Sequence, residues 1–226
     1  MTKILRIIFS VCVLCFCFNP FVWSATEQVI SVTAQIPEAS PSMSITILKF
    51  NDGNTDNNPW TNSTEVKWLD FGTLTYLMNG KNAGFFYSPN AFCVVVFTDP
   101  FGKPYEIKQS SMGLASTGGT AIPANSFASV PVYSRDDLWV WEGGSAKQGD
   151  MPEGARLGNP GSAVGENQLV YSSESGIGTA RIIQLYYSLP PYGVGGSSPF
   201  SGFSPIPLTQ PPDTYTGTIT LTMSVK

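Results

Sequence analysis

The sequence of 226 residues contains no histidine, only four cysteines and few charged residues, which make up 12% of the chain. Without histidine, Ser-His-Asp and Cys-His catalytic arrangements and the usual zinc and copper sites are excluded. The apolar run near the N-terminus, residues 7–18, covers twelve positions, whereas about 20 are needed to span a bilayer as a helix. We therefore expect a protein that is not an enzyme and has no stable membrane span.

The N-terminal segment has the pattern of a secretory signal peptide. Two basic residues precede the apolar run, and the residues before Ser24 suit signal-peptidase cleavage after that position, so residues 1–24 are predicted to be removed. Cleavage would leave Cys93 as the one thiol, which excludes an internal disulfide. The remaining ten Lys and Arg against sixteen Asp and Glu give a net charge of −6, which argues against nucleic acid and anionic membranes as partners. We expect one domain over residues 25–226, located in the periplasm, at the cell surface or secreted.

The rest of the chain has an all-β pattern. Short runs rich in Val, Ile, Thr, Tyr and Phe lie between the 22 glycines and 18 prolines. Residues 215–225 alternate apolar or glycine with Thr or Ser, which predicts a strand with one buried and one solvent-facing side. The continuous apolar run at 91–98 predicts a central strand buried on both faces. About nine or ten such strands indicate an antiparallel β-sandwich with long Gly/Pro-rich loops at 143–167 and 190–213.

Aromatic and acidic residues gather at positions 136–142. The acidic ones could form the carboxylate pair of a glycoside hydrolase, but a solvated turn before an edge strand explains them more simply. Trp139 and Trp141 share a strand face and could bind a carbohydrate without cleaving it, with Trp60 as a further contact. A secreted carbohydrate-binding module is therefore one of the alternatives.

A polar loop carries the start of a calcium-binding pattern. Asp52, Asn54 and Asp56 occupy alternate positions, as the first ligands of a calcium loop do. The glycine expected at the sixth position and the acid expected at the twelfth are replaced by Asn57 and Ser63. A plain polar loop is the simpler interpretation, and calcium bound by the three alternate residues is the alternative.

Four segments in sequence order carry a resemblance to a known family. They are ISVTAQI at 30–36, LDFGTL at 69–74, FCVVVFTDPFGKPYEI at 92–107 and PDTYTGTITLTMSVK at 212–226. Together they resemble the spore coat protein U-like domains, which include subunits of archaic chaperone–usher pili. The resemblance implies an immunoglobulin-like sandwich at the cell surface, assembled into fibres in which a neighbour's N-terminal segment supplies a missing strand. The cysteine that commonly follows the first strand in that family is absent here.

The expected assembly segment is the first predicted strand. Ile30, Val32, Ala34 and Ile36 lie on one face of it and would seat in the protein's own core or in a neighbour's groove. We therefore expect an exported structural or adhesive envelope protein, such as a pilus-like or surface-coat subunit. Its expected partners are further copies of itself or a periplasmic chaperone and usher.

Overall fold

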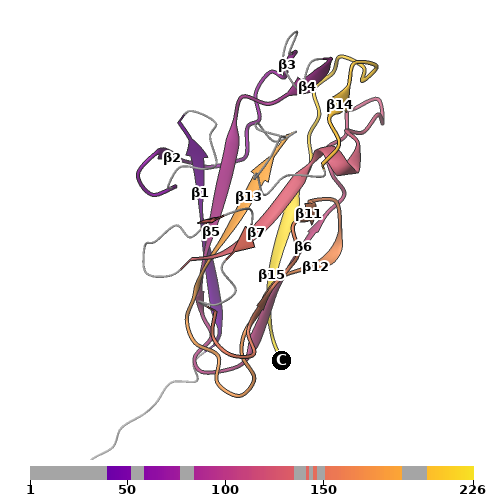
Figure 1. Ribbon diagram of the computed structural model, residues 1–226. Helices are drawn as coiled ribbons and strands as arrows, with labels where there is room; N and C mark the ends of the chain where they lie inside the picture. The colour runs from indigo at the N-terminus through magenta and orange to yellow at the C-terminus, as the bar shows by residue number, and fades with distance from the viewer. Residues whose placement is uncertain are drawn as a thin grey trace, which may run out of the picture. The chain divides into compact units, whose positions relative to one another are not determined.

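The computed structural model describes most of one compact unit, Ala39–Lys226 (Figure 1). The described residues are 40–51, 59–76, 84–134, 141–142, 145–146, 151–189 and 203–226. This part of the chain is almost entirely β, with a single 3-10 turn, η1 (Ala124–Ser126), and no α-helix. No helix in it has the length and apolar character that crossing a membrane requires. The predicted all-β fold is confirmed.

Two antiparallel sheets form the body of the unit. The larger has the strand order β11-β7-β13-β5-β1-β2, and its strands are β1 (Ser42–Phe50), β2 (Ser63–Val66), β5 (Ala91–Asp99), β7 (Ala128–Ser134), β11 (Gly161–Ser162) and β13 (Ile182–Ser188). The smaller has the order β10-β12-β6-β15, and its strands are β6 (Tyr105–Ser111), β10 (Arg156–Leu157), β12 (Gly165–Ser172) and β15 (Ile219–Val225). The remaining strands are short.

The short strands make two small antiparallel sheets. One has the order β14-β4-β3, from β3 (Thr75–Tyr76), β4 (Phe85–Tyr87) and β14 (Ile206–Pro207). The other pairs β8 (Trp141–Glu142) with β9 (Ser145–Ala146). Strands β9, β10 and β11 fall inside the segment 143–167, and β14 falls inside 190–213, so the prediction that these two segments are loops is wrong where these strands form.

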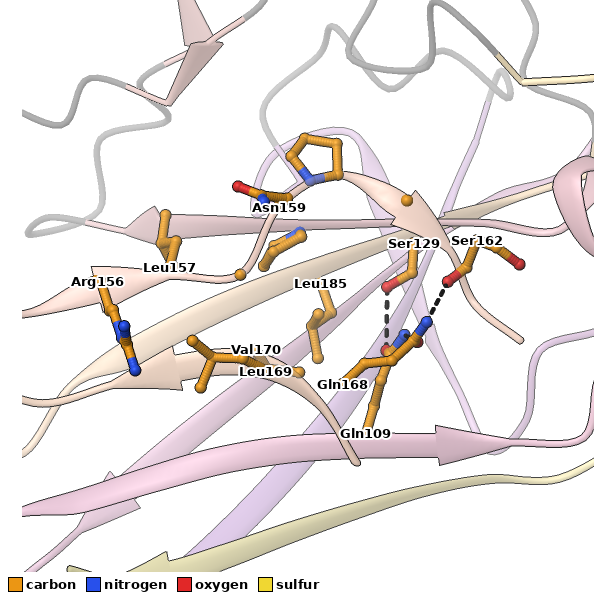
Figure 2. Close-up of a pocket in the computed structure, with 14 residues that line it drawn as sticks. Gln109, Ser129, Arg156, Leu157, Asn159, Ser162, Gln168, Leu169, Val170 and Leu185 are labelled. Carbon is orange, nitrogen blue, oxygen red and sulfur yellow. Dashed lines mark hydrogen bonds between the residues drawn. The ribbon is translucent and has the colours of Figure 1, made fainter. Parts of the chain in front are cut away.

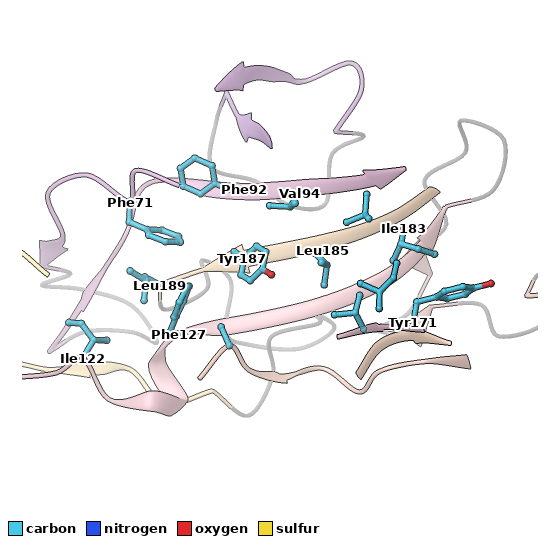
Figure 3. Packing of buried hydrophobic residues seen from close by; sticks show 14 of the residues in the cluster. Phe71, Phe92, Val94, Ile122, Phe127, Tyr171, Ile183, Leu185, Tyr187 and Leu189 are labelled. Carbon is cyan, nitrogen blue, oxygen red and sulfur yellow. The ribbon is translucent and has the colours of Figure 1, made fainter. Parts of the chain in front are cut away.

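The main core lies between the two large sheets. It combines buried side chains of β5 and β13 with those of β6 and β12. Figure 3 shows Phe71, Phe127 and Leu189 close together at one end of this core. The ring of Phe71 meets those of Phe92 and Phe127 edge-on, with centroids 5.1 and 5.7 Å apart. Each such pair contributes about 0.5–1.5 kcal/mol beyond the area it buries.

The Asp-Phe-Gly segment holds Phe71 in place by local hydrogen bonds. The backbone N–H of Gly72 donates to the carboxylate of Asp70 at 2.9 Å. Gly72 has φ +66°, a left-handed conformation that glycine adopts without strain. The hydroxyl of Ser88 donates a hydrogen bond to the backbone carbonyl of Phe71 at 2.7 Å. The side-chain amide of Asn90 donates one to the backbone carbonyl of Asp70 at 2.9 Å. The segment is therefore a turn that delivers one aromatic ring to the core.

The larger sheet is buried on its outer face as well. A second cluster there includes Leu48, Phe50, Cys93, Val95 and Tyr186. Because neighbouring residues of β5 alternate between the two clusters, the whole run from Ala91 to Val96 is buried. The predicted central strand is thus confirmed. Burial raises the pKa of the Cys93 thiol well above its ordinary value, which keeps this group protonated and unreactive.

Candidate functional site

The smaller sheet ends on β15, whose outer edge carries no strand in the described part of the chain. β15 pairs with β6 alone, in the register Leu221↔Gln109 and Met223↔Ile107. Every second residue of β6 is buried, and opposite residues of an antiparallel pair point to the same side. The apolar residues of β15 therefore face the interior, while Thr222 and its even-numbered neighbours are exposed. The alternation predicted for this strand is confirmed.

The inward apolar residues of β15 are only partly covered. Ile219, Leu221 and Met223 pack against the core yet remain partly accessible to solvent, and Val225 is 46% exposed. Their partners on β6, such as Tyr105 and Ile107, are fully buried. The inward side chains of β6 and β15 point to the same side of the sheet but differ sharply in burial. The reason is that β6 has a strand on each side, whereas β15 has a described strand on one side.

Strand β1 shows the same contrast on the larger sheet. Met43, Ile45 and Ile47 lie at alternate positions on its inner face. Ile45 pairs with Val96, which is fully buried in the main core, so both side chains point inward. Val96 is 0% exposed and Ile45 is 51% exposed. A half-exposed isoleucine on the inner face of a sandwich means that the core is not closed over it.

The two partly covered rows lie on the same side of the sandwich. The ring of Tyr133 on β7 stacks on that of Tyr171 on β12, and the hydroxyls of Thr98 on β5 and Tyr105 on β6 share a hydrogen bond. Because β7 thus faces β12 and β5 faces β6, the next strands along, β1 and β15, are on the same side of the two sheets. The β2 strand covers the edge of β1 only from Ile47 to Phe50. We call these two partly covered rows, together with the outer edge of β15, the open groove; its residues are Met43, Ile45, Ile47, Ile219, Leu221, Met223 and Val225.

The open groove has the chemistry of a strand-accepting site. The outer edge of β15 offers main-chain N–H and C=O groups, and the two rows offer an apolar floor with a period of two residues. An extended segment with apolar side chains at alternate positions satisfies both features at once. Fully burying one half-exposed side chain such as that of Ile45 would contribute roughly 1 kcal/mol.

A second concave feature, a cavity of about 500 Å³, lies between β7, β12 and the chain that joins β10 to β11 (Figure 2). On its lining, the amide oxygen of Gln109 accepts hydrogen bonds from Ser129 Oγ at 3.0 Å and Tyr187 Oη at 2.9 Å. The amide nitrogen of Gln109 donates to Gln168 Oε1 at 2.8 Å. These groups satisfy one another, so they cross-link the two sheets. Gln109 lies two residues after Ile107 and four after Tyr105, so the alternation of the strand places it on the same buried side. This alternation is the sequence signal that marks the glutamine as buried.

A polar cluster closes the end of the sandwich where β5 ends and β6 begins. The hydroxyls of Thr98 and Tyr105 share a hydrogen bond of 2.8 Å, and Arg181 Nη2 lies 3.3 Å from Glu174 Oε1. Burial is the main cause that raises the pKa of Tyr105 and Tyr171 above the ordinary tyrosine value. The cluster ties the connection between β12 and β13 to the start of β6.

Most of the sequence-predicted site residues lie outside the described residues. They are the assembly residues Ile30, Val32, Ala34 and Ile36, the calcium candidates Asp52, Asn54 and Asp56, and Trp139. Trp141 is in β8, but its side chain is also outside the described part. Trp60 is exposed, with its ring centroid 6.3 Å from that of Phe97. Within the described residues, no three acidic, Cys or His side chains are grouped to hold a metal ion.

Comparisons of the chain with protein-family models, with curated proteins and with solved structures found no match.

Proposed function

We propose that this protein is an exported structural or adhesive subunit of a bacterial envelope, with a sandwich that is completed by a strand from a second copy. The observation that carries the proposal is the half-exposed Ile45 on an inner face, in a sandwich whose β15 has no described strand on its outer edge. A chain that ended its folding in this state would leave apolar rows and main-chain groups in water. An added strand would cover the apolar rows and form hydrogen bonds with the main-chain groups of β15.

The order of the strands supports an immunoglobulin-like reading of the sandwich. In that architecture one sheet has the order A-B-E-D and the other contains C, F and G. The order β1-β5-β13-β7 follows the first pattern, with β6 and β15 in the places of C and F. Sequence order agrees, since these strands follow one another as A to F. No described strand takes the place of G beside β15, and that place is the open groove.

The segment 28–36 fits the open groove by its pattern. Its apolar residues at 30, 32, 34 and 36 repeat with the period of the groove rows. Insertion into the chain's own groove would run this segment parallel to β15, because it leads directly into the start of β1. All strand pairs of the described sheets are antiparallel, and parallel pairing is slightly less stable. A second copy can insert the same segment antiparallel, which favours exchange between copies.

Removing the donor segment tests the proposal. The chain from residue 25 is compared with a chain that begins at residue 37, by sedimentation velocity and by thermal unfolding. We expect the longer chain to associate, and the truncated chain to remain monomeric with a lower Tm. Ile45→Asp in the longer chain should also prevent association, whereas Thr222→Asp, on the outward face of β15, should not. A truncated chain that is equally stable and equally associated contradicts strand exchange.

A further inference from the structure

The turn between β5 and β6 places a large aromatic residue in a strained conformation. The N–H of Lys103 donates to the carbonyl of Pro100 at 3.0 Å, and the two central residues, Phe101 and Gly102, have φ of +48° and +76°. Positive φ at both central positions is the type I′ geometry, which favours Asn, Asp or Gly. A phenylalanine with positive φ is disfavoured, and such strain concentrates at functional positions.

The strain at Phe101 is not compensated by burial. Its side chain is 50% exposed, and that of Ile177 on the adjacent loop is 72% exposed. The two loops are joined by the bridge Gly102↔Gly178, with a hydrogen bond of 3.1 Å from the N–H of Gly178. A Cβ atom on Gly178 would lie 2.0 Å from the carbonyl oxygen of Lys103, so glycine is required for the loops to meet. We call Phe101 and Ile177 the tip pair.

The tip pair lies where the chain enters β1. Asp99, two residues before Phe101, pairs with Ser42, the first residue of β1. Residues 37–41 separate the proposed donor segment from β1 and include Pro37 and Pro41, which favour extended backbone. These residues reach about 20 Å at most. A copy that accepts the donor segment is therefore held within about 20 Å of the start of β1, the end of the unit that carries the tip pair.

The opposite end of the accepting copy offers a matching apolar side chain. A donor that runs antiparallel to β15 leaves the groove where β15 begins, at Ile219. Ile219 pairs with Ser111, and the next residue, Met112, is 97% exposed. Met112 thus stands, without a burial role of its own, at the end of the groove from which the donor emerges. Methionine sulfur packs favourably against aromatic rings.

We infer that the tip pair of one copy packs against Met112 of the copy that accepts its donor strand, which fixes the angle between successive subunits. This inference rests on the proposed strand exchange. It assigns a role to a strained aromatic residue and to two aliphatic side chains that folding of the single unit leaves in water.

The substitution Phe101→Asn separates this role from a structural one. Asparagine tolerates positive φ, so the Tm of the unit should stay the same or rise, while association of the chain from residue 25 should weaken by about tenfold. Phe101→Tyr keeps the ring and should associate as the original chain does. Met112→Ser should weaken association to a similar degree, and its combination with Phe101→Asn should add little further.

Sedimentation equilibrium of the four variants gives the dissociation constants. Non-additive losses at the two positions support the contact. If Phe101→Asn lowers the Tm and leaves association unchanged, the tip contact is overturned and strand exchange stands. If the chain from residue 25 does not associate before any substitution, both strand exchange and the tip contact are overturned.

Discussion

Replacing Gln109 by leucine should destabilise the sandwich from its centre. The side chain is 4% exposed and makes three hydrogen bonds, to Ser129, Tyr187 and Gln168. Leucine removes all three and leaves the buried hydroxyls of Ser129 and Tyr187 without their acceptor. An unsatisfied buried polar group costs about 1–3 kcal/mol, while the leucine side chain regains about 1 kcal/mol by burial. With two such groups, the free energy of unfolding should therefore fall by about 1–5 kcal/mol.

Urea unfolding of Gln109→Leu, Tyr187→Phe and the double variant measures this effect. The double variant no longer carries the tyrosine hydroxyl that Gln109→Leu leaves without an acceptor. Its loss of unfolding free energy should therefore be at least about 1 kcal/mol smaller than the sum of the losses in the two single variants. Lys108→Leu is the matched control on the solvent-facing side of the same strand; it removes a partly exposed ion pair with Glu106, worth about 0–1 kcal/mol. A change of less than about 0.5 kcal/mol for Gln109→Leu would refute the assigned role of the network.

Two further predictions concern the tip and the pH dependence. Gly178→Ala should lower the Tm more than Gly118→Ala, because the added Cβ meets the Lys103 carbonyl oxygen at 2.0 Å in the first case and nothing nearer than Ser116 Oγ at 3.7 Å in the second; equal Tm values would contradict the close approach of the two loops. Burial raises the pKa of Tyr105, Tyr171 and Tyr187 in the folded chain, so stability is fully present below the unfolded tyrosine pKa of about 10 and is lost as pH rises above it. Unfolding free energies measured from pH 8 to 11 should show this decline, and tyrosinate absorbance should rise together with unfolding; a chain that ionises these tyrosines while still folded would contradict it.

Much of the strand pattern could be predicted because it depends on local alternation. The run at 128–134 is rich in Val, Tyr and Ser, a composition typical of a strand, and it forms β7 although it contains Pro131. The proline is tolerated because β11 pairs with β7 only at Ala128 and Ser129, so the missing N–H lies at a free edge. The alternation of Met43, Ile45 and Ile47 in the sequence is likewise a local pattern, and these residues form the inward face of β1.

The open groove could not be predicted from the same pattern. Whether Ile45 is covered depends on which strand lies beside β1 and β15, and that is set by pairings between segments far apart in sequence. The left-handed backbone conformation of Phe101 could not be predicted from the sequence either, since none of the residues that favour positive φ occupies that position. The alternation in the sequence predicts which side of a strand is apolar, and the order of strands in the sheets shows whether that side is covered.

Binding of a peptide with the sequence of residues 28–36 to the chain that begins at residue 37 tests strand acceptance by the open groove most directly. Calorimetric titration should show saturable binding at one site, and the Tm of the chain should rise with peptide concentration. Binding should be lost in Ile45→Asp and kept in Thr222→Asp. A folded truncated chain that binds no peptide, or that binds it equally well after Ile45→Asp, would contradict the account.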